Sequence, residues 1–232
     1  MSVYIEIQRS IQVAARHFEL DIKINTQAQR IALFGPSGSG KTLTIQAMAG
    51  LLTPDSGEVR INNTVLFNSA TGINIIPQKR KLAYLLQDYG LFPHLTVGQN
   101  ISFGLHKGFF NPSRKWLPTE AKRWVDAFEL APILNNYPAE ISGGQKQRTA
   151  LARALAVAPE LLLLDEPLAA LDSHLRVRMR QELAQLQHKL DIPSIIITHD
   201  PEDALMLADE VYKIADGKIV EECSPTELMA QI

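Results

Sequence analysis

The sequence predicts an α/β fold with a mainly parallel core sheet, and three observations carry this prediction. Short, wholly apolar runs recur along the chain, as is typical of strands that are buried on both faces. Helical patterns separate these runs, which indicates parallel strands joined by crossover helices. One run, Ile31–Phe34, is followed at once by a glycine-rich segment that opens a helix. The chain of 232 residues is long enough for one large domain.

The first third of the chain is expected to combine an antiparallel β subdomain with the start of the core. Apolar and polar residues alternate over residues 3–7 and 18–24, as in half-buried antiparallel strands. Residues 59–67, with Asn62-Asn63 at the turn, are typical of a hairpin. The basic run at 79–81 is interpreted as a solvent-exposed entry to a buried strand at 82–86.

A helical subdomain is predicted over residues 88–140, inserted between two parallel strands. Thr96 is expected to cap a helix through 105, and Thr119 a helix through about 130. The irregular stretch between them carries Phe109, Phe110 and Trp116, which form either the core of this subdomain or a partner-binding surface. The single domain 1–232 then has a core made of residues 1–87 and 141–232.

The last third is predicted to alternate helices and strands again, beginning with a helix that Ser142 opens. Asp172 is expected to cap a long helix, in which the arginines at 176, 178 and 180 are interpreted as a solvated face. The further expected elements are strands at 161–164 and 195–197, helices from 200 to about 208 and from 224, and a hairpin over 211–220.

A phosphate-binding loop is predicted where strand, glycine-rich segment and helix follow one another. Glycines allow the backbone N–H groups to point inward at a phosphate, and the helix adds its free N–H groups and the positive end of its dipole. Lys41 supplies a charge for the β- and γ-phosphates, and Thr42 offers a hydroxyl to Mg²⁺. The alternative, a glycine-rich turn without function, is disfavoured by this context. The loop comprises Gly35, Pro36, Ser37, Gly38, Ser39, Gly40, Lys41 and Thr42.

Polar side chains follow three further buried strands at the edge where ligands bind in parallel sheets. Asp165 follows four leucines and is suited to a Mg²⁺ site, and the adjacent Glu166 is placed to orient or deprotonate an attacking water. His199 can donate to a γ-phosphate, and Gln87 can ligate Mg²⁺ or hold the water. The set predicts hydrolysis of a nucleoside triphosphate.

The composition excludes several other classes of protein. A net charge of −2 and a pI of about 6.3 argue against a nucleic-acid binder with a broad basic surface. The single cysteine, Cys223, allows no internal disulfide, and the N-terminus has no signal-peptide pattern. The apolar runs fall short of the ~18–20 residues that a membrane span needs. We therefore expect any membrane role to come through a partner.

The segment Ile141-Ser142-Gly143-Gly144-Gln145 resembles the signature sequence of ABC-type ATPases. It precedes the Leu161–Asp165 strand at the spacing of that family, and the other motifs occur in the family's order. Isoleucine at 141 and alanine at 169 are mild departures from the family, which more often has leucine and serine at these positions. The matching motifs are the Walker A loop at Gly35–Thr42, the Q-loop at Gln87, the Walker B strand ending at Asp165, Glu166, the D-loop at Ala169–Asp172 and the switch histidine His199.

This resemblance implies a composite site. In such ATPases two cassettes pack head to tail with two ATP molecules between them. Ser142, Gly143, Gly144 and Gln145 would face the γ-phosphate bound to the partner copy, and Asp172 would run across the interface. Mg²⁺ would be held by Thr42, Gln87 and Asp165. The helical insert would receive coupling helices from a membrane permease, with a substrate-binding protein in the wider system and no nucleic-acid partner.

The motifs resemble most the ATPase subunits of importers for sulfate, molybdate and related oxyanions, or for polyamines and sugars. Such a subunit would lie on the cytoplasmic face of the plasma membrane. No aromatic residue for adenine stacking occurs near 10–16, so Arg16 or His17 are left as candidates, and this absence favours the molybdate type. The alternative is a soluble ABC ATPase of translation or DNA maintenance. Longer importer subunits carry a C-terminal regulatory domain, and the sequence does not decide whether this chain lacks it or was shortened.

Overall fold

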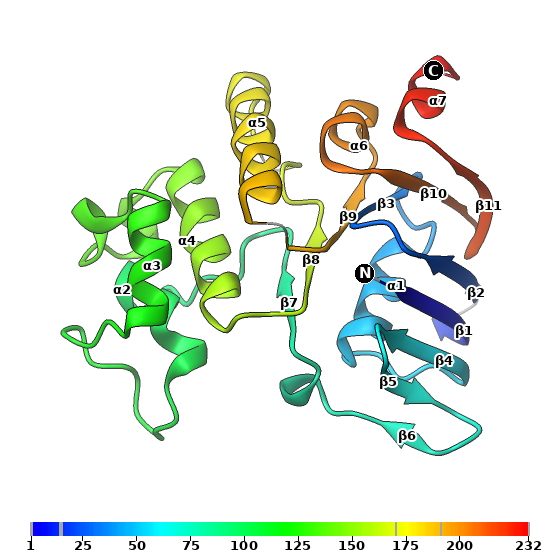
Figure 1. Cartoon of the computed structure of the whole chain (residues 1–232), viewed down its shortest axis with the longest axis horizontal. Coiled ribbons are helices and arrows are strands. Elements are labelled where there is room, and N and C mark those ends of the chain that lie inside the picture. Colours follow the sequence, from blue (N-terminus) through cyan, green and yellow to red (C-terminus); the bar gives the residue numbers. More distant parts are fainter. Residues whose placement is uncertain (1, 14–15, 170, 191, 232) are drawn as a thin grey trace.

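Eleven strands form one continuous sheet in the computed structural model, which describes residues 2–13, 16–169, 171–190 and 192–231 (Figure 1). The strands are β1 (Val3–Val13), β2 (Arg16–Thr26), β3 (Arg30–Phe34), β4 (Ser56–Ile61), β5 (Thr64–Asn68), β6 (Ile73–Asn74), β7 (Leu82–Leu85), β8 (Leu161–Asp165), β9 (Ser194–Thr198), β10 (Glu210–Ala215) and β11 (Lys218–Cys223). The α-helices are α1 (Lys41–Ala49), α2 (Val97–Ser102), α3 (Thr119–Ala127), α4 (Gly143–Ala156), α5 (Ser173–Leu190), α6 (Pro201–Leu207) and α7 (Pro225–Ala230).

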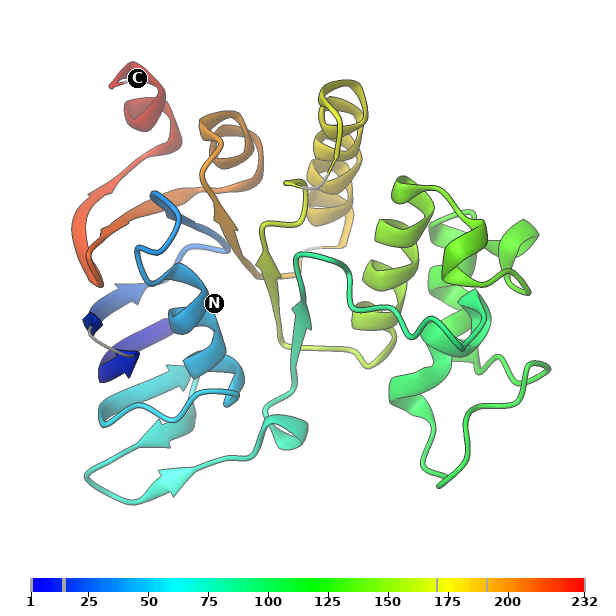
Figure 2. The same cartoon turned by 180° about the vertical axis from the view of Figure 1, so that it is seen from behind.

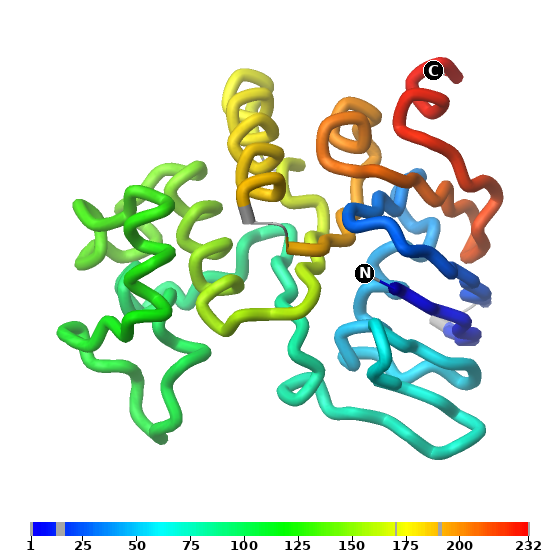
Figure 3. Tube along the Cα trace, in the orientation of Figure 1, coloured from blue at the N-terminus to red at the C-terminus, as the bar shows by residue number. Residues whose placement is uncertain are grey.

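The sheet has a parallel part and an antiparallel part. Its strand order is β6-β5-β4-β1-β2-β11-β10-β3-β9-β8-β7. Neighbouring strands from β10 through β3, β9 and β8 to β7 are parallel, whereas β6, β5, β4, β1 and β2 pair antiparallel. The trace in Figure 3 shows the antiparallel strands stacked at one end of the molecule and the parallel strands in its middle. Both predicted parts of the sheet are therefore present.

The parallel strands are buried because apolar side chains on both of their faces enter a core. Ile31 and Leu33 of β3 pack on one side of the sheet in a cluster that includes Met48 of α1. Ala32, between them, packs on the other side in the cluster that contains Leu151 of α4. This alternation explains why the strands appear in the sequence as continuous apolar runs.

One basic residue predicted to be exposed is buried. Arg80 has 2% of its surface accessible, and its guanidinium donates to the carbonyls of Ala47 (2.8 Å) and Met48 (2.7 Å) at the end of α1. It also donates to the carbonyl of Ile75 at 2.6 Å. The interpretation of 79–81 as a solvent-exposed run is thus wrong for its middle member, because a cation at a helix C-terminus satisfies the free carbonyls and the helix dipole.

The arginines of α5 also differ from the prediction. Arg178 is exposed as expected, but the side chain of Arg180 is only 4% accessible and pairs with Asp200, Glu202 and Asp203. Residues two apart on a helix point in different directions, so a run of arginines at alternate positions does not make one solvated face. The helix itself begins as predicted, since the Asp172 carboxylate accepts a hydrogen bond from the Leu175 N–H at 3.0 Å.

Three helices stand beside the sheet as a helical unit. Both cartoon views place α2, α3 and α4 together, on the opposite side of the molecule from the antiparallel strands (Figures 1 and 2). Thr96 caps α2 through a capping box, as predicted, whereas α3 has Pro118 at its N-cap and Thr119 is its first helical residue. Trp116 is 36% accessible, and Phe109 and Phe110 are almost wholly exposed. The division of the chain at 88 and 140 stays a prediction, and the helical unit also includes α4, which begins at Gly143.

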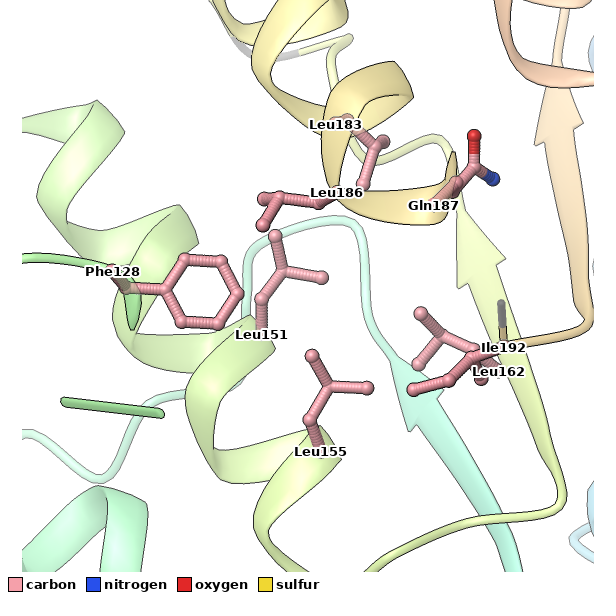
Figure 4. Close-up of a pocket in the computed structure, with 8 residues that line it drawn as sticks. All are labelled: Phe128, Leu151, Leu155, Leu162, Leu183, Leu186, Gln187 and Ile192. Atoms are coloured by element: carbon pink, nitrogen blue, oxygen red, sulfur yellow. The ribbon is translucent and has the colours of Figure 1, made fainter. Parts of the chain in front are cut away.

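A small apolar cavity of about 20 Å³ lies where the helical unit meets the core (Figure 4). Leucines of α4 and α5 face one another across it, with Phe128 and Ile192 at its ends. Gln187 is the one polar residue among the eight that are drawn, and its amide donates to Ser194 Oγ at 2.8 Å. A cavity with this lining offers no group for chemistry.

Candidate functional site

A polar cleft of about 250 Å³ brings together residues from three separate parts of the chain. The loop before α1, the segment after β7 and the end of β8 all contribute to it, because these ends lie at the same edge of the parallel sheet. The lining residues are Ser37, Gly38, Gly40, Lys41, Thr42, Leu43, Gln87, Asp165 and Glu166. Most of the residues predicted at strand ends therefore meet in one place.

Two glycines give the loop before α1 its shape. A Cβ atom on Gly35 would lie 2.2 Å from the carbonyl oxygen of Ile214, so no larger residue fits there. Gly40 has φ +109°, and a Cβ on it would lie 2.8 Å from Leu20 Cδ1 and 3.2 Å from Phe18 Cζ. The fold of this chain therefore requires glycine at both positions.

Lys41 is held inside the loop that it follows. Its ammonium donates to the carbonyls of Gly35 (2.8 Å) and Pro36 (2.6 Å), and 4% of the residue is accessible. Burial lowers the pKa of Lys41, and the carboxylates of Glu166 and Asp165 oppose this shift. A buried cation whose hydrogen bonds go only to neutral oxygen atoms is well prepared to bind an anion.

Asp165 and Thr42 bring a carboxylate and a hydroxyl together in the lining of the cleft. Thr42 Oγ1 donates to one carboxylate oxygen of Asp165 at 3.2 Å, and the Tyr84 hydroxyl donates to the other at 2.7 Å. Burial raises the pKa of Asp165, while the hydrogen bonds from Tyr84 and Thr42 lower it. Burial and the bond to Asp165 likewise raise the pKa of Tyr84.

Tyr84 is a contributor that the sequence reasoning missed. Tyr84 lies within the otherwise apolar strand β7. Its hydroxyl group is the only feature of that sequence that could have indicated a role in the site. Its hydrogen bond fixes the orientation of the carboxylate and leaves Asp165 Oδ1 toward Thr42. Hydroxyl and carboxylate oxygens are the ligands that Mg²⁺ prefers, so the residues present fit such an ion. Among the described residues, no group of three or more His, Cys, Asp or Glu could hold a metal by itself.

Glu166 lines the cleft, and His199 lies beside Glu166 without being one of the lining residues. The distance from His199 Nδ1 to Glu166 Oε2 is 3.6 Å, and the two side chains are 55% and 19% accessible. Glu166 has φ +45°, an unusual backbone conformation for a non-glycine residue, and its N–H donates to the carbonyl of Ile197. This conformation belongs to a sharp turn directly after β8, which is a common feature of functional sites.

A network of ion pairs supports the turn that carries His199. Arg180 of α5 contacts Asp203 (2.5 Å), Asp200 (2.9 Å) and Glu202, all at the start of α6. Thr198 Oγ1 donates to Asp203 at 3.0 Å and accepts from the Asp200 N–H at 3.0 Å. The residues on both sides of His199 are thereby fixed to the body of the protein, although His199 itself is exposed.

Arg176 connects two of the segments that the sequence singled out. Its guanidinium donates to the carbonyls of Ala169 (3.3 Å) and Leu171 (3.2 Å), and it lies 3.7 Å from Asp200. The D-loop backbone and the turn after β9 therefore share one side chain. Ala170, between these two carbonyls, lies outside the described residues.

Ser142, Gly143, Gly144 and Gln145 form the start of α4 and are absent from the lining of the cleft. Ser142 Oγ accepts from the Gln145 N–H, and Gln145 Oε1 accepts from the Ser142 N–H, so a capping box closes this helix end. A Cβ on Gly143 would meet its nearest neighbour, Leu171 Cδ2, at an ordinary 3.6 Å. The chain's own packing gives no reason for glycine at 143.

Of the two candidates for adenine contact, only His17 has a described side chain. His17 is exposed, and its ring nitrogen Nε2 lies 2.9 Å from Ser10 Oγ. The side chain of Arg16 is outside the described residues. Phe18 is half-buried, and its ring edge packs against Gly40 of the phosphate loop.

Comparison with known proteins identifies the family. A family model described as "ABC transporter" matches residues 18–169, well over half of the chain. This chain belongs to the ABC transporter family. The cassette superposes on the dimeric structure of MJ0796, a bacterial ABC transporter cassette, with a TM-score of 0.77 and 26% identity over 97% of this chain and 99% of that one. The predicted α/β fold, with its phosphate loop between strand and helix, is confirmed.

Curated relatives of this ABC cassette are named as import ATP-binding proteins. The sulfate/thiosulfate protein CysA of Synechocystis sp. is 44% identical over 82% of this chain and 51% of its own length. The molybdenum protein ModC of Rhodospirillum rubrum is 39% identical over 86% and 53%. The molybdate/tungstate protein WtpC of Archaeoglobus fulgidus is 38% identical over 92% and 85%. The cassette thus spans about half the length of the first two relatives and most of the third.

Proposed function

We propose that this chain is the ATP-binding and ATP-hydrolysing subunit of a membrane importer for an oxyanion such as molybdate or sulfate. One observation carries the enzymatic part: a single cleft contains the phosphate loop, Gln87, Asp165 and Glu166. The sulfate and molybdate import proteins among its relatives support the importer assignment and the class of substrate.

In this proposal the phosphate loop binds the phosphates of ATP. Lys41 exchanges its bonds to the Gly35 and Pro36 carbonyls for the β- and γ-phosphate oxygens, and the N–H groups at the start of α1 add to the attraction. Thr42, Asp165 and Gln87 would hold Mg²⁺, which neutralises phosphate charge when it is bound. Tyr84 keeps the carboxylate of Asp165 in place throughout.

Glu166 orients the attacking water and accepts its proton, and His199 donates to the γ-phosphate. The 3.6 Å separation between His199 Nδ1 and Glu166 Oε2 supports this pairing of roles, because one γ-phosphate and its attacking water could lie within reach of both side chains. Gln87 is exposed at the cleft wall and provides a neutral ligand for the metal or for the water.

The site is completed by a second copy of the chain. Gly143 lies at an accessible helix N-terminus, and nothing within its own chain requires glycine there, so the requirement comes from outside. Helix N-termini attract anions, and a glycine allows close approach to the γ-phosphate of ATP bound to the partner copy. The cassette MJ0796 is described as dimeric, with ADP and Pi bound in a post-hydrolysis state. Asp172, at the end of the D-loop, would lie at this interface.

Transport itself would require further subunits. No helix in the described part of the chain is long and apolar enough to cross a membrane. A permease would therefore carry the substrate pathway, a substrate-binding protein would deliver the oxyanion, and this chain would sit at the cytoplasmic face of the plasma membrane. No observation favours a role in translation or DNA maintenance, and no nucleic-acid partner is proposed.

Glu166→Gln tests the hydrolytic assignment most simply. Loss of the carboxylate removes the base without changing the size of the side chain, so the rate of ATP hydrolysis should fall by roughly 10²–10⁴-fold. Binding of ATP, measured with a fluorescent analogue, should persist, and an ATP-dependent dimer should accumulate in gel filtration. Turnover within a factor of two of the unmodified chain would show that Glu166 is not the base.

A further inference from the structure

The loop that joins the α2 region to α3 presents two phenylalanines to solvent. Phe109 and Phe110 are 108% and 88% accessible, whereas the next most exposed large apolar side chain of the described residues, Val220, reaches 62%. Leaving two phenyl rings in water forgoes a large hydrophobic gain, and such a patch usually marks a surface that binds something. Neither residue takes part in the nucleotide cleft.

The base of this loop is fixed to the helical unit. The side-chain amide of Gln99 in α2 donates to the carbonyl of Pro112 at 2.6 Å, and Pro112 itself is buried. The rings of His106 and Trp116 meet edge to face with their centroids 5.3 Å apart, which closes the two ends of the loop on each other. The phenylalanines therefore sit at the tip of a loop that is already shaped.

The charged residues within this loop all have one sign. Lys107, Arg114 and Lys115 are exposed beside it, and the chain has no Asp or Glu between Asp88 and Glu120. This is notable in a protein whose net charge is −2. An apolar tip with basic flanks and a neighbouring tryptophan complements a bilayer that has anionic headgroups over a hydrocarbon interior.

We propose that residues 107–116 form a membrane-contact loop, in which Phe109 and Phe110 enter the interface of an anionic bilayer. Lys107 and Lys115 lie at the level of the headgroup phosphates. Arg114 contributes charge while its guanidinium stacks 5.4 Å from the centre of the Tyr137 ring. This goes beyond the proposed role in ATP hydrolysis and does not depend on it. A protein groove is disfavoured as the occupant because the loop carries no acidic group and its tip offers only hydrocarbon.

Sedimentation with protein-free vesicles tests the proposal. The full chain is mixed with vesicles of phosphatidylglycerol and phosphatidylcholine, so that no permease contributes to binding. Phe109→Ala together with Phe110→Ala should weaken vesicle binding at least about tenfold, since two apolar side chains no longer leave water. The matched control replaces two exposed aliphatic residues elsewhere, Leu51→Ala with Val220→Ala, and should bind as the unmodified chain does. Pure phosphatidylcholine or high salt should also weaken binding.

A second measurement locates the tip in the bilayer. Phe110→Trp adds a fluorophore at the tip of the loop, and lipids brominated on their acyl chains should quench the emission of this variant more than that of the unmodified chain, whose Trp116 lies at the base of the same loop. The proposal is wrong if the double alanine variant binds vesicles like its control, or if brominated lipids leave the added tryptophan unquenched. ATP hydrolysis is measured separately on each variant, so failure here and failure of the proposed function are distinguishable.

Discussion

The two glycine-rich segments of this cassette differ in what requires their glycines. At Gly35 and Gly40 a side chain would collide with the body of the same chain, at 2.2 Å and 2.8 Å. At Gly143 a Cβ would meet nothing closer than 3.6 Å, and its φ is not in the left-handed region. Gly35 and Gly40 are required by the packing of their own chain, whereas the packing of the chain gives no reason for glycine at 143.

This difference shows how a half-site can be recognised from one chain. Where contacts within the chain explain the residue types of a segment, no partner is needed to account for them. The phosphate loop around Lys41 is such a segment. A segment that is accessible and well capped, yet retains an unexplained glycine, points to a molecule outside the chain. The comparison therefore supports the composite site without any partner in view.

The network behind the cleft provides the largest expected effect. Arg180→Met leaves the buried carboxylate of Asp203 without a cation and Asp200 with only the more distant Arg176, so the free energy of unfolding should fall by about 3–5 kcal/mol. Arg178→Met on the same helix changes an exposed pair with Glu182 and should cost less than about 0.5 kcal/mol. Urea titration of both variants measures the two free energies of unfolding. Equal losses would mean that the turn carrying His199 is not held by this network.

Lys41 tests whether the phosphate loop is finished within one chain. Lys41→Ala removes the buried cation, and ATP affinity should weaken by roughly a hundredfold or more even at protein concentrations too low for dimers. Isothermal titration of dilute protein measures this directly. If Gly143→Ala weakened binding in the dilute chain as much as Lys41→Ala does, the two segments would not be separate halves.

The glycines themselves give the smallest but most specific difference. Gly40→Ala forces a strained backbone and a contact with Leu20, and should destabilise the chain by about 1–3 kcal/mol. Gly143→Ala should be neutral or stabilising by about 0.5 kcal/mol, because alanine suits a helix better than glycine does. Hydrolysis by the second variant should nevertheless fall at least about tenfold. Thermal unfolding and an ATPase assay on the same samples measure both effects. A Gly143→Ala variant that is less stable than Gly40→Ala, or that hydrolyses ATP at the unmodified rate, would contradict this prediction.

Much of the fold could be predicted because the strands of the core are buried on both faces. A short, wholly apolar run such as Ile195–Ile197 is typical of a strand buried on both faces. Helix starts were predicted from capping residues, and the structure confirms those at Thr96, Ser142, Asp172 and Ser224. The cleft could be predicted for a related reason, since parallel strands deliver their ends to one edge.

The sequence-based predictions that failed concern the burial of long charged side chains and the role of a single hydroxyl group. Whether Arg80 or Lys79 turns inward depends on where the end of α1 lies, and that is a tertiary fact. Arg180 is buried because α6 begins with three acidic residues that face it. Tyr84 was missed because one tyrosine in a strand is ordinarily a packing residue. In each case the local pattern is compatible with both outcomes.

The central claim is that a working site needs the phosphate loop of one copy and the signature segment of another. Two variants that are each inactive test it when they are mixed. Lys41→Ala disables the loop. Gly143→Asp should fold normally, because an aspartate suits a helix N-terminus, but it places a carboxylate where the partner's γ-phosphate would bind.

A mixed dimer of the two variants contains one site with an intact loop and an intact glycine. With random pairing, half of the dimers carry one working site of two, so the mixture should recover about a quarter of the ATPase activity of the unmodified chain. The measurement is the hydrolysis rate of the equimolar mixture against each variant alone at the same total concentration. Recovery near a quarter is the predicted result. No recovery, or full activity of Gly143→Asp by itself, would contradict the account.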